Sequence, residues 1–192
     1  MEVWNLMASE AGPNTVTDGL ILCLDAANTN SYPGSGTAWT DISGKGANGT
    51  LTNGPTFNSG NKGSIVLDGT DDSVEFSPTV VLDGSYTSSF LFFSSNNGSN
   101  SQQMNNGTNG WSLYRYQNGN VCIRTVGGNR YNWSCPYRTE IKNKLCFLDF
   151  VSNGTNIEFF LNNVSQGSIT PNNVTLNVNR LGCTRSGQQL DG

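Results

Sequence analysis

The chain has 192 residues, which fits one large β-sheet domain, and only 12% of them are charged, with a formal net charge of −4 and a pI near 4.6. An acidic chain of this kind lacks the basic surface of a nucleic-acid-binding protein, and no apolar run approaches the ~18 residues of a membrane-spanning helix. Histidine is absent, which excludes catalytic triads, imidazole bases and most zinc chemistry.

Asparagine and glycine dominate the composition, with 27 and 23 residues, and both favour turns and exposed strand faces over helix interiors. Residues 1–18 are interpreted as an N-terminal arm, which lacks the basic start and long apolar core of a signal peptide. We expect the apolar side chains of this arm to bury against a neighbouring protein rather than against their own domain; they are Trp4, Leu6 and Met7.

Short apolar runs bounded by turn residues follow the arm, and each predicts one or more strands. They span residues 19–26, 64–69, 73–76, 85–93, 110–126, 144–169 and 174–183. Asn-Gly pairs in "QNGN" and "SNGT" predict hairpin turns within two of these segments. Strands separated by turns at this spacing predict an all-β fold, a two-sheet antiparallel sandwich, with a short turn near 40–43 as the best helical candidate.

The strand patterns also predict which side chains form the core. Alternation along "IEFFL" places Ile157, Phe159 and Leu161 on one face. The five cysteines are odd in number and contain no CxxC pair, so we expect reduced thiols without disulfides and Cys23 buried in the first strand. The full predicted core comprises Leu20, Leu22, Leu24, Ile65, Leu67, Phe76, Phe147, Phe159 and Leu161.

The segments "GLILCLDAANTN", "TLTNGPTF" and "GSIVLDGTDDSVEF", within 19–43, 44–57 and 62–76, follow one another in a characteristic order. Further along, "KLCFLDFVSNGTNIEFFLNNVSQGSI" (144–169) gives a hairpin, and "LNVNRLGCTRSG" (176–187) gives the next strand and turn. This order resembles the concanavalin A-like, laminin G-type jelly roll of bacteriophage tail-fibre and other structural proteins. The resemblance covers nearly all of 19–192 and implies a jelly-roll domain preceded by the arm.

One difference from that family concerns the end of the chain. The family places a further strand after a terminal "DG", near the N-terminal strand, whereas this chain ends at Leu190, Asp191 and Gly192. The resemblance therefore implies an apolar edge at 20–25. A strand from a second chain would cover that edge, and a strand in residues beyond 192 is the alternative.

Acidic residues offer two further kinds of site. Glycan hydrolysis needs paired carboxylates, for which the fold's usual pattern is E-x-D-x-x-E, and this pattern does not occur, so we predict that the protein is not an enzyme. Some relatives bind calcium through loop carboxylates, which Asp68, Asp71 and Asp72 also offer. Capping of turn amides by these aspartates is the favoured interpretation, and no cofactor is expected.

The loop "RTVGGNRYNWSCPYR" (124–138) combines aromatic rings with guanidinium groups. Such a set suits the face of a sugar ring, a protein–protein contact, or packing beneath the loop itself. The candidate residues are Arg130, Tyr131, Trp133, Tyr137 and Arg138.

The leading hypothesis is a non-enzymatic virion structural protein, either a fibre module or a capsid-surface decoration. It would dock through its arm onto other virion proteins, associate with copies of itself and display the lectin-like domain. The alternative is a carbohydrate-binding module that recognises a host-surface glycan, and glycan binding by the isolated domain distinguishes the two.

Overall fold

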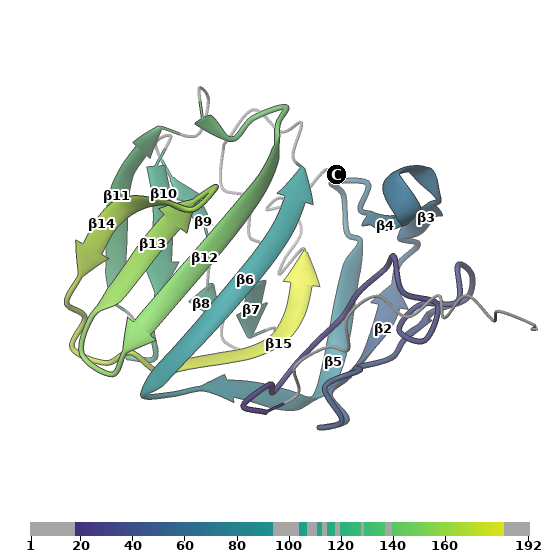
Figure 1. Cartoon of the computed structure of the whole chain (residues 1–192), viewed down its shortest axis with the longest axis horizontal. Helices are drawn as coiled ribbons and strands as arrows, with labels where there is room; N and C mark the ends of the chain where they lie inside the picture. Colours follow the sequence, from purple (N-terminus) through teal and green to yellow (C-terminus); the bar gives the residue numbers. More distant parts are fainter. Residues whose placement is uncertain are drawn as a thin grey trace, which may run out of the picture.

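The computed structural model describes residues 18–93, 104–106, 111–112, 115–117, 120–127, 129–136 and 140–182, and the fold is an all-β sandwich of antiparallel sheets, as predicted (Figure 1). One layer is a six-stranded sheet in the order β1 (Ala38–Trp39), β2 (Asn48–Thr52), β5 (Ser73–Leu82), β15 (Leu176–Gly182), β7 (Met104–Asn106) and β8 (Trp111–Ser112). The other is a four-stranded sheet in the order β14 (Val164–Ile169), β13 (Ile157–Leu161), β12 (Leu145–Asn153) and β6 (Ser85–Phe93).

Two smaller sheets complete the described strands. The three-stranded sheet has the order β11 (Arg130–Pro136), β10 (Asn120–Arg124) and β9 (Arg115–Gln117). The two-stranded sheet pairs β3 (Thr56–Asn58) with β4 (Ser64–Val66), and the short 3-10 turn η1 (Gly60–Lys62) lies between them. Within the described ranges, no helix has the length and apolar character needed to cross a bilayer.

Alternation along β12 and β13 builds the main core. Leu148, Phe150, Ile157 and Phe159 are fully buried, and the rings of Phe150 and Phe159 stack with centroids 5.1 Å apart. Leu161 is also buried, so the predicted shared face of "IEFFL" is confirmed. The predictions for Leu67 and Phe76 are confirmed as well.

The predicted core is wrong at Phe147. Phe147 is 47% exposed, because the strand alternation that buries Cys146 and Leu148 turns it outward. Leu22, Leu24 and Ile65 are half-buried and pack against the buried core clusters, so their predicted place at the core is confirmed in part. Leu20 is half-buried.

The apolar segment 19–26 is not a strand, which corrects the prediction for "GLILCLDA". The backbone N–H of Cys23 donates to the Asp41 carboxylate at 2.9 Å, and its carbonyl accepts from Ile42 N–H at 3.0 Å. The backbone groups of Cys23 are therefore hydrogen-bonded to the loop at 41–42 of the same chain. Cys23 itself is half-buried and lies outside any sheet. The expected strand addition from a second chain assumed a strand ladder at 20–25, and that assumption is wrong for this segment.

The short turn predicted near 40–43 is present at 42–43 but is not helical, and a buried carboxylate, that of Asp41, holds the loop around it. Asp41 accepts hydrogen bonds from the backbone of Cys23, Ser43 and Ala47 and from the Ser43 hydroxyl, at 2.8–3.1 Å. Burial alone would raise the pKa of this carboxyl, but the four hydrogen bonds outweigh it, and the pKa is lowered.

Cys135 and Cys146 are buried thiols, and Cys23 is also a thiol. Burial raises the pKa of Cys135 to about 11, which keeps it protonated at neutral pH. The predictions for Trp4, Leu6 and Met7, and for the chain end at Leu190–Gly192, lie outside the described residues.

Candidate functional site

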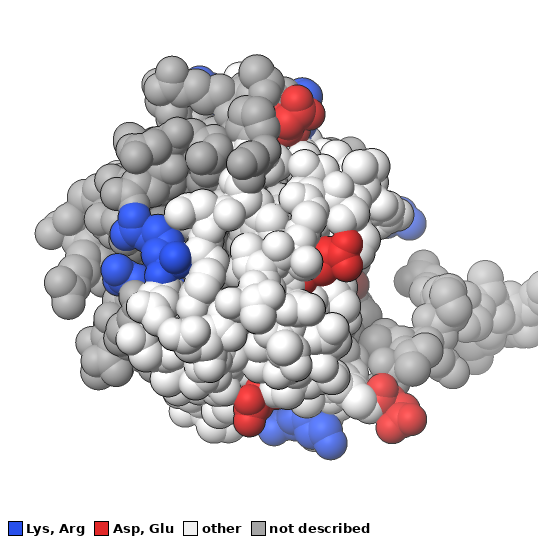
Figure 2. All heavy atoms as spheres, turned by 90° about the vertical axis from the view of Figure 1, so that its left-hand side faces the viewer, with Lys and Arg blue, Asp and Glu red and all other residues white. Residues whose placement is uncertain are grey.

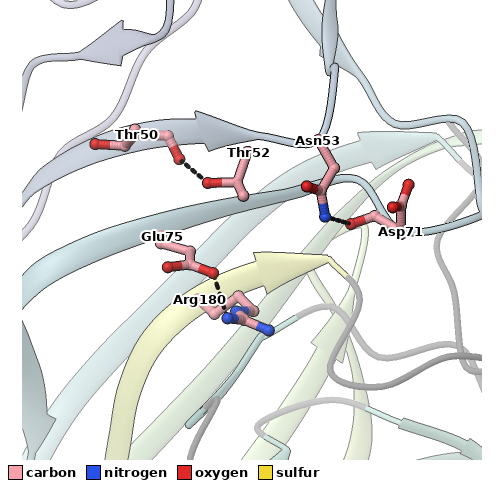
Figure 3. Close-up of polar contacts among 6 residues, drawn as sticks. All are labelled: Thr50, Thr52, Asn53, Asp71, Glu75 and Arg180. Atoms are coloured by element: carbon pink, nitrogen blue, oxygen red, sulfur yellow. Dashed lines mark hydrogen bonds and ion pairs between the residues drawn. The ribbon is translucent and has the colours of Figure 1, made fainter.

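The outward face of the six-stranded sheet carries a row of polar side chains across β2, β5 and β15. In the strand register, Thr50 lies opposite Glu75, and Glu75 lies opposite Arg180. The neighbouring residues Leu51 and Val74 are buried on the inner face, so alternation turns Thr50 and Glu75 outward. Figure 3 shows this row with its hydroxyl, carboxylate and guanidinium groups in sequence across the strands.

Glu75 and Arg180 form an ion pair through Oε1 and Nη2. Their side chains are 46% and 25% exposed, so both groups remain accessible to a ligand from solvent. An ion pair exposed to this degree contributes little to folding, typically about 0–1 kcal/mol. The pair supplies one hydrogen-bond acceptor group and one donor group side by side, with no net charge.

The row lies in a shallow hollow, termed the β5 groove, with a volume of about 610 Å³. This volume falls within the ~300–1,000 Å³ typical of small-molecule sites. Apart from Phe76, which is buried, its lining is polar: Asn48, Thr50, Thr52, Glu75, Ser77, Thr79, Asn179 and Arg180. The groove can therefore hydrogen-bond a ligand rich in hydroxyl groups.

The loop 68–72 lies at one end of this groove, where Asn53 Nδ2 donates to the Asp71 carbonyl at 3.0 Å (Figure 3). Asp68 Oδ1 accepts from Thr70 N–H at 2.7 Å, and Asp72 Oδ2 accepts from Asp68 N–H at 2.9 Å. Gly69 between them has a φ of +75°, which a tight turn here requires. Turn capping by Asp68 is therefore confirmed.

These hydrogen bonds also set the protonation of the loop. The hydrogen bond from the Thr70 backbone is the main cause that lowers the pKa of Asp68. Burial first, and then the neighbouring charges of Asp68 and Asp71, raise the pKa of Asp72.

Oxygens from Asp68, Asp71 and Asp72 lie within 4.8 Å of one another, so these residues can approach one cation. Calcium takes about six to eight oxygen ligands, and two of the three carboxylates already accept backbone N–H groups. The expectation that this loop holds no calcium stays a prediction.

The candidate residues of 124–138 that the structure describes do not form an exposed aromatic platform. Trp133 is 3% exposed, its Nε1 donates to the Gly167 carbonyl at 3.0 Å, and its ring contacts Phe150 and Phe159. Tyr131 is half-buried, with its hydroxyl accepting from Asn172 N–H at 3.0 Å.

The arginine of this set that the structure describes, Arg130, is half-buried on β11. Tyr137 and Arg138 lie outside the described residues. Figure 2 faces the β11 and β14 side of the molecule and shows few charged groups there among uncharged surface.

The β5 groove was not predicted from the sequence. Alternation in "NGTLT" and "SVEFS" is enough to place Thr50 and Glu75 on outward faces of their strands. The partner of Glu75, however, is Arg180, which is 105 positions away in the chain. Only the strand order β2-β5-β15 places these residues in one row.

No family model matches the sequence, and no curated protein matches it. Among solved structures, the botulinum neurotoxin serotype D ligand-binding domain in complex with N-acetylneuraminic acid is similar, with a TM-score of 0.65 and 16% identity. The match covers 92% of this chain and 47% of that one. The receptor-binding domain of the botulinum neurotoxin C/D mosaic serotype has a TM-score of 0.65 and 17% identity, over 91% of this chain and 46% of that one.

Domain 4 of AbnA, a GH43 extracellular arabinanase from Geobacillus stearothermophilus, in complex with arabinotriose, is also similar. Its TM-score is 0.51 at 16% identity, over 80% of this chain and 82% of that one. This chain therefore spans about half of the toxin domains and most of the arabinanase domain. At identities this low, the structural similarity shows a shared β-sandwich fold alone.

Proposed function

We propose that this protein is a non-catalytic glycan-binding domain and that the β5 groove holds the sugar. The observation that carries the proposal is the solvent-accessible row of Thr50, Glu75 and Arg180 within a polar hollow. Vicinal hydroxyl groups of a sugar can donate to the carboxylate and accept from the guanidinium at the same time. Because the pair is neutral overall, we infer a neutral glycan rather than an acidic one.

The fold supports this proposal. The arabinanase domain, which resembles most of the sandwich, was solved with arabinotriose, and one of the toxin domains was solved with a sialic acid. Since this chain spans only about half of the toxin domains, their ligand is a weaker guide than arabinotriose.

The groove's described lining supports a role without catalysis, because its acidic member is Glu75, which is paired with Arg180. Glycoside hydrolysis needs a second carboxylate about 5–10 Å away, as acid or nucleophile. With Glu75 as the lining's acidic group, we propose binding without bond cleavage.

The test is a glycan array followed by calorimetry on the best neutral oligosaccharide. Glu75→Gln and Thr50→Val should each lower affinity at least about 10-fold, because each removes a buried hydrogen bond to the ligand. Glu158→Gln, a matched change on β13 of the other sheet, should bind like wild type. Wild-type protein that binds no array glycan, or groove variants that bind unchanged, would refute the proposal.

We further propose that the domain is displayed on a virion, as a fibre module or a capsid-surface decoration, and the sequence resemblance supports this role. In that setting the domain would present the β5 groove to a host glycan while the arm docks onto the particle. Deleting residues 1–12 should leave the sandwich folded and remove it from purified particles. Retention of the shortened protein on particles would contradict arm docking.

A further inference from the structure

The outward face of the four-stranded sheet carries a cluster of large exposed apolar side chains. Seven large hydrophobic residues are exposed in the described part of the chain, and four of them form one block on β6 and β12. Leu91 lies opposite Phe147 in the register, and Phe93 lies opposite Leu145. These four side chains, termed the apolar block, are 45–62% exposed.

The block has the size of a functional patch. A phenylalanine presents roughly 150–250 Å², so two half-exposed rings and two leucines expose about 400 Å² in total. The largest apolar patch on a typical monomer is about 300–600 Å² and often marks an interaction site. Nearby outward positions of β6 are polar, as at Thr87 and Ser89. A face that only had to be soluble would be polar throughout, so the four clustered apolar residues indicate a contact surface.

We propose that the apolar block binds the same block of a second copy of this chain, forming a two-fold symmetric dimer through the four-stranded sheets. The pattern of the block suits a copy of itself. Leucine and phenylalanine alternate around its four corners, so a two-fold axis in the sheet plane, along or across the strands, places each phenyl ring opposite a leucine. Large and small side chains then interdigitate, as packing of two identical faces requires.

Charges at the two ends of the block favour one of these axes. Lys144 is exposed and precedes Leu145, whereas Asp149 lies beyond Phe147 on the same outward face of β12. An axis across the strands brings the Lys144 end of one copy over the Asp149 end of the other. An axis along the strands instead places the two Lys144 ends together and the two Asp149 ends together, and the repulsion between like charges disfavours it.

The buried area sets the expected strength. Two apolar blocks face to face remove about 800 Å² from water, which is below the ~1,200–2,000 Å² of a standard interface, so flanking polar residues must contribute as well. We therefore expect a reversible dimer with a dissociation constant on the order of 10 μM.

The dimer has a consequence for ligand binding. The β5 groove lies on the outer face of the six-stranded sheet, on the opposite side of the sandwich from the block (Figure 1). Both grooves remain open and point away from each other, so one dimer can join two ligand-bearing surfaces.

The test is sedimentation equilibrium of the full chain from about 1 μM to about 300 μM. The average mass of wild-type protein should rise from 20.6 kDa toward twice that value. Phe147→Glu should remain monomeric throughout, whereas Val81→Glu, at a 54% exposed valine on β5, should dimerise like wild type. If Phe147→Glu fails to fold, Leu145→Thr serves as the test, because it is a milder change that keeps strand propensity. This variant should weaken the dimer at least about 10-fold.

A wild-type protein that stays monomeric, or a Phe147→Glu protein that dimerises normally, would overturn the proposal. Lys144→Glu should weaken the dimer, and adding Asp149→Lys should restore it; failure of this rescue would overturn the axis across the strands. Glu75→Gln should leave the dimer intact, so failure of glycan binding and failure of dimerisation are separate results.

Discussion

The two outer faces of the sandwich follow the same strand alternation and yet have opposite chemistry. Across β2, β5 and β15 the outward row is a hydroxyl, a carboxylate and a guanidinium, whereas across β6 and β12 it is leucine and phenylalanine. Inside, both sheets contribute apolar side chains to one core. Core formation therefore constrains only every second residue of a strand, whereas the outward residues can be selected for what each face contacts.

The largest effect should separate the inner and outer sides of β12. Phe150→Ala removes a fully buried ring and should lower the free energy of unfolding by about 3–5 kcal/mol, whereas Phe147→Ala, at a 47% exposed ring, should cost about 1 kcal/mol or less. Urea unfolding at low protein concentration, where the chain is monomeric, measures both. Equal losses would mean that Phe147 belongs to the core after all.

A second, smaller effect concerns the loop that supports the edge of the polar face. Asp41→Asn replaces a charged acceptor of four hydrogen bonds and should cost about 2 kcal/mol at pH 7. The folded pKa of Asp41 is lowered, so its contribution is present above the unfolded value of 3.8 and is lost as the pH falls through the folded pKa. Thermal melts of both proteins from neutral to acidic pH should therefore converge; a difference that does not depend on pH contradicts this account.

The loop at the end of the β5 groove should respond to pH with the opposite sign. The folded pKa of Asp72 is raised, so its stabilising contribution exists below the unfolded value of 3.8 and is lost as the pH rises through the folded pKa. Asp72→Asn should raise the melting temperature at pH 7 by roughly 2–4 °C, equivalent to about 1 kcal/mol or less, and by nothing below the unfolded value.

Calcium provides the control for the loop. A cation held by Asp68, Asp71 and Asp72 would favour their charged forms and reverse the effect of Asp72→Asn. We expect calcium and EDTA to leave the wild-type melting temperature unchanged. A rise in the melting temperature with calcium would show that these aspartates bind the metal, in contrast to the expected turn capping.

The smallest effect on stability should come from the polar row itself. Glu75→Gln breaks an exposed ion pair and should change the free energy of unfolding by about 0.5 kcal/mol, less at high salt. Because the same change is expected to lower glycan affinity at least about 10-fold, folding and ligand binding should separate at this residue. A stability loss above about 2 kcal/mol would show that the pair supports the sheet rather than a ligand.

Local patterns predicted much of this molecule. Apolar runs and Asn-Gly turns indicated most of the antiparallel strands from 73 onward, and alternation placed Ile157, Phe159 and Leu161 in the core. The interpretation of 124–138 as a loop was wrong for 130–136, which form β11, and β7 was not predicted. The same reasoning was wrong for 19–26, because an apolar run does not reveal whether a neighbouring strand exists to pair with it. It was also wrong for Phe147, because an aromatic residue in a strand was assigned to the core without counting its alternation from Leu148.

The sequence by itself determined the all-β class, the turn chemistry and the absence of a histidine-based site, since these depend on residue types and spacing along the chain. Tertiary structure decided everything that needs strands distant in sequence to become neighbours. The Glu75–Arg180 pair joins positions 105 apart, Trp133 is buried under β14 rather than offered to a ligand, and the apolar block needs β6 beside β12. The physical reason is that a strand sets which residues share its face, whereas only the order and register of the sheet set which residues meet across it.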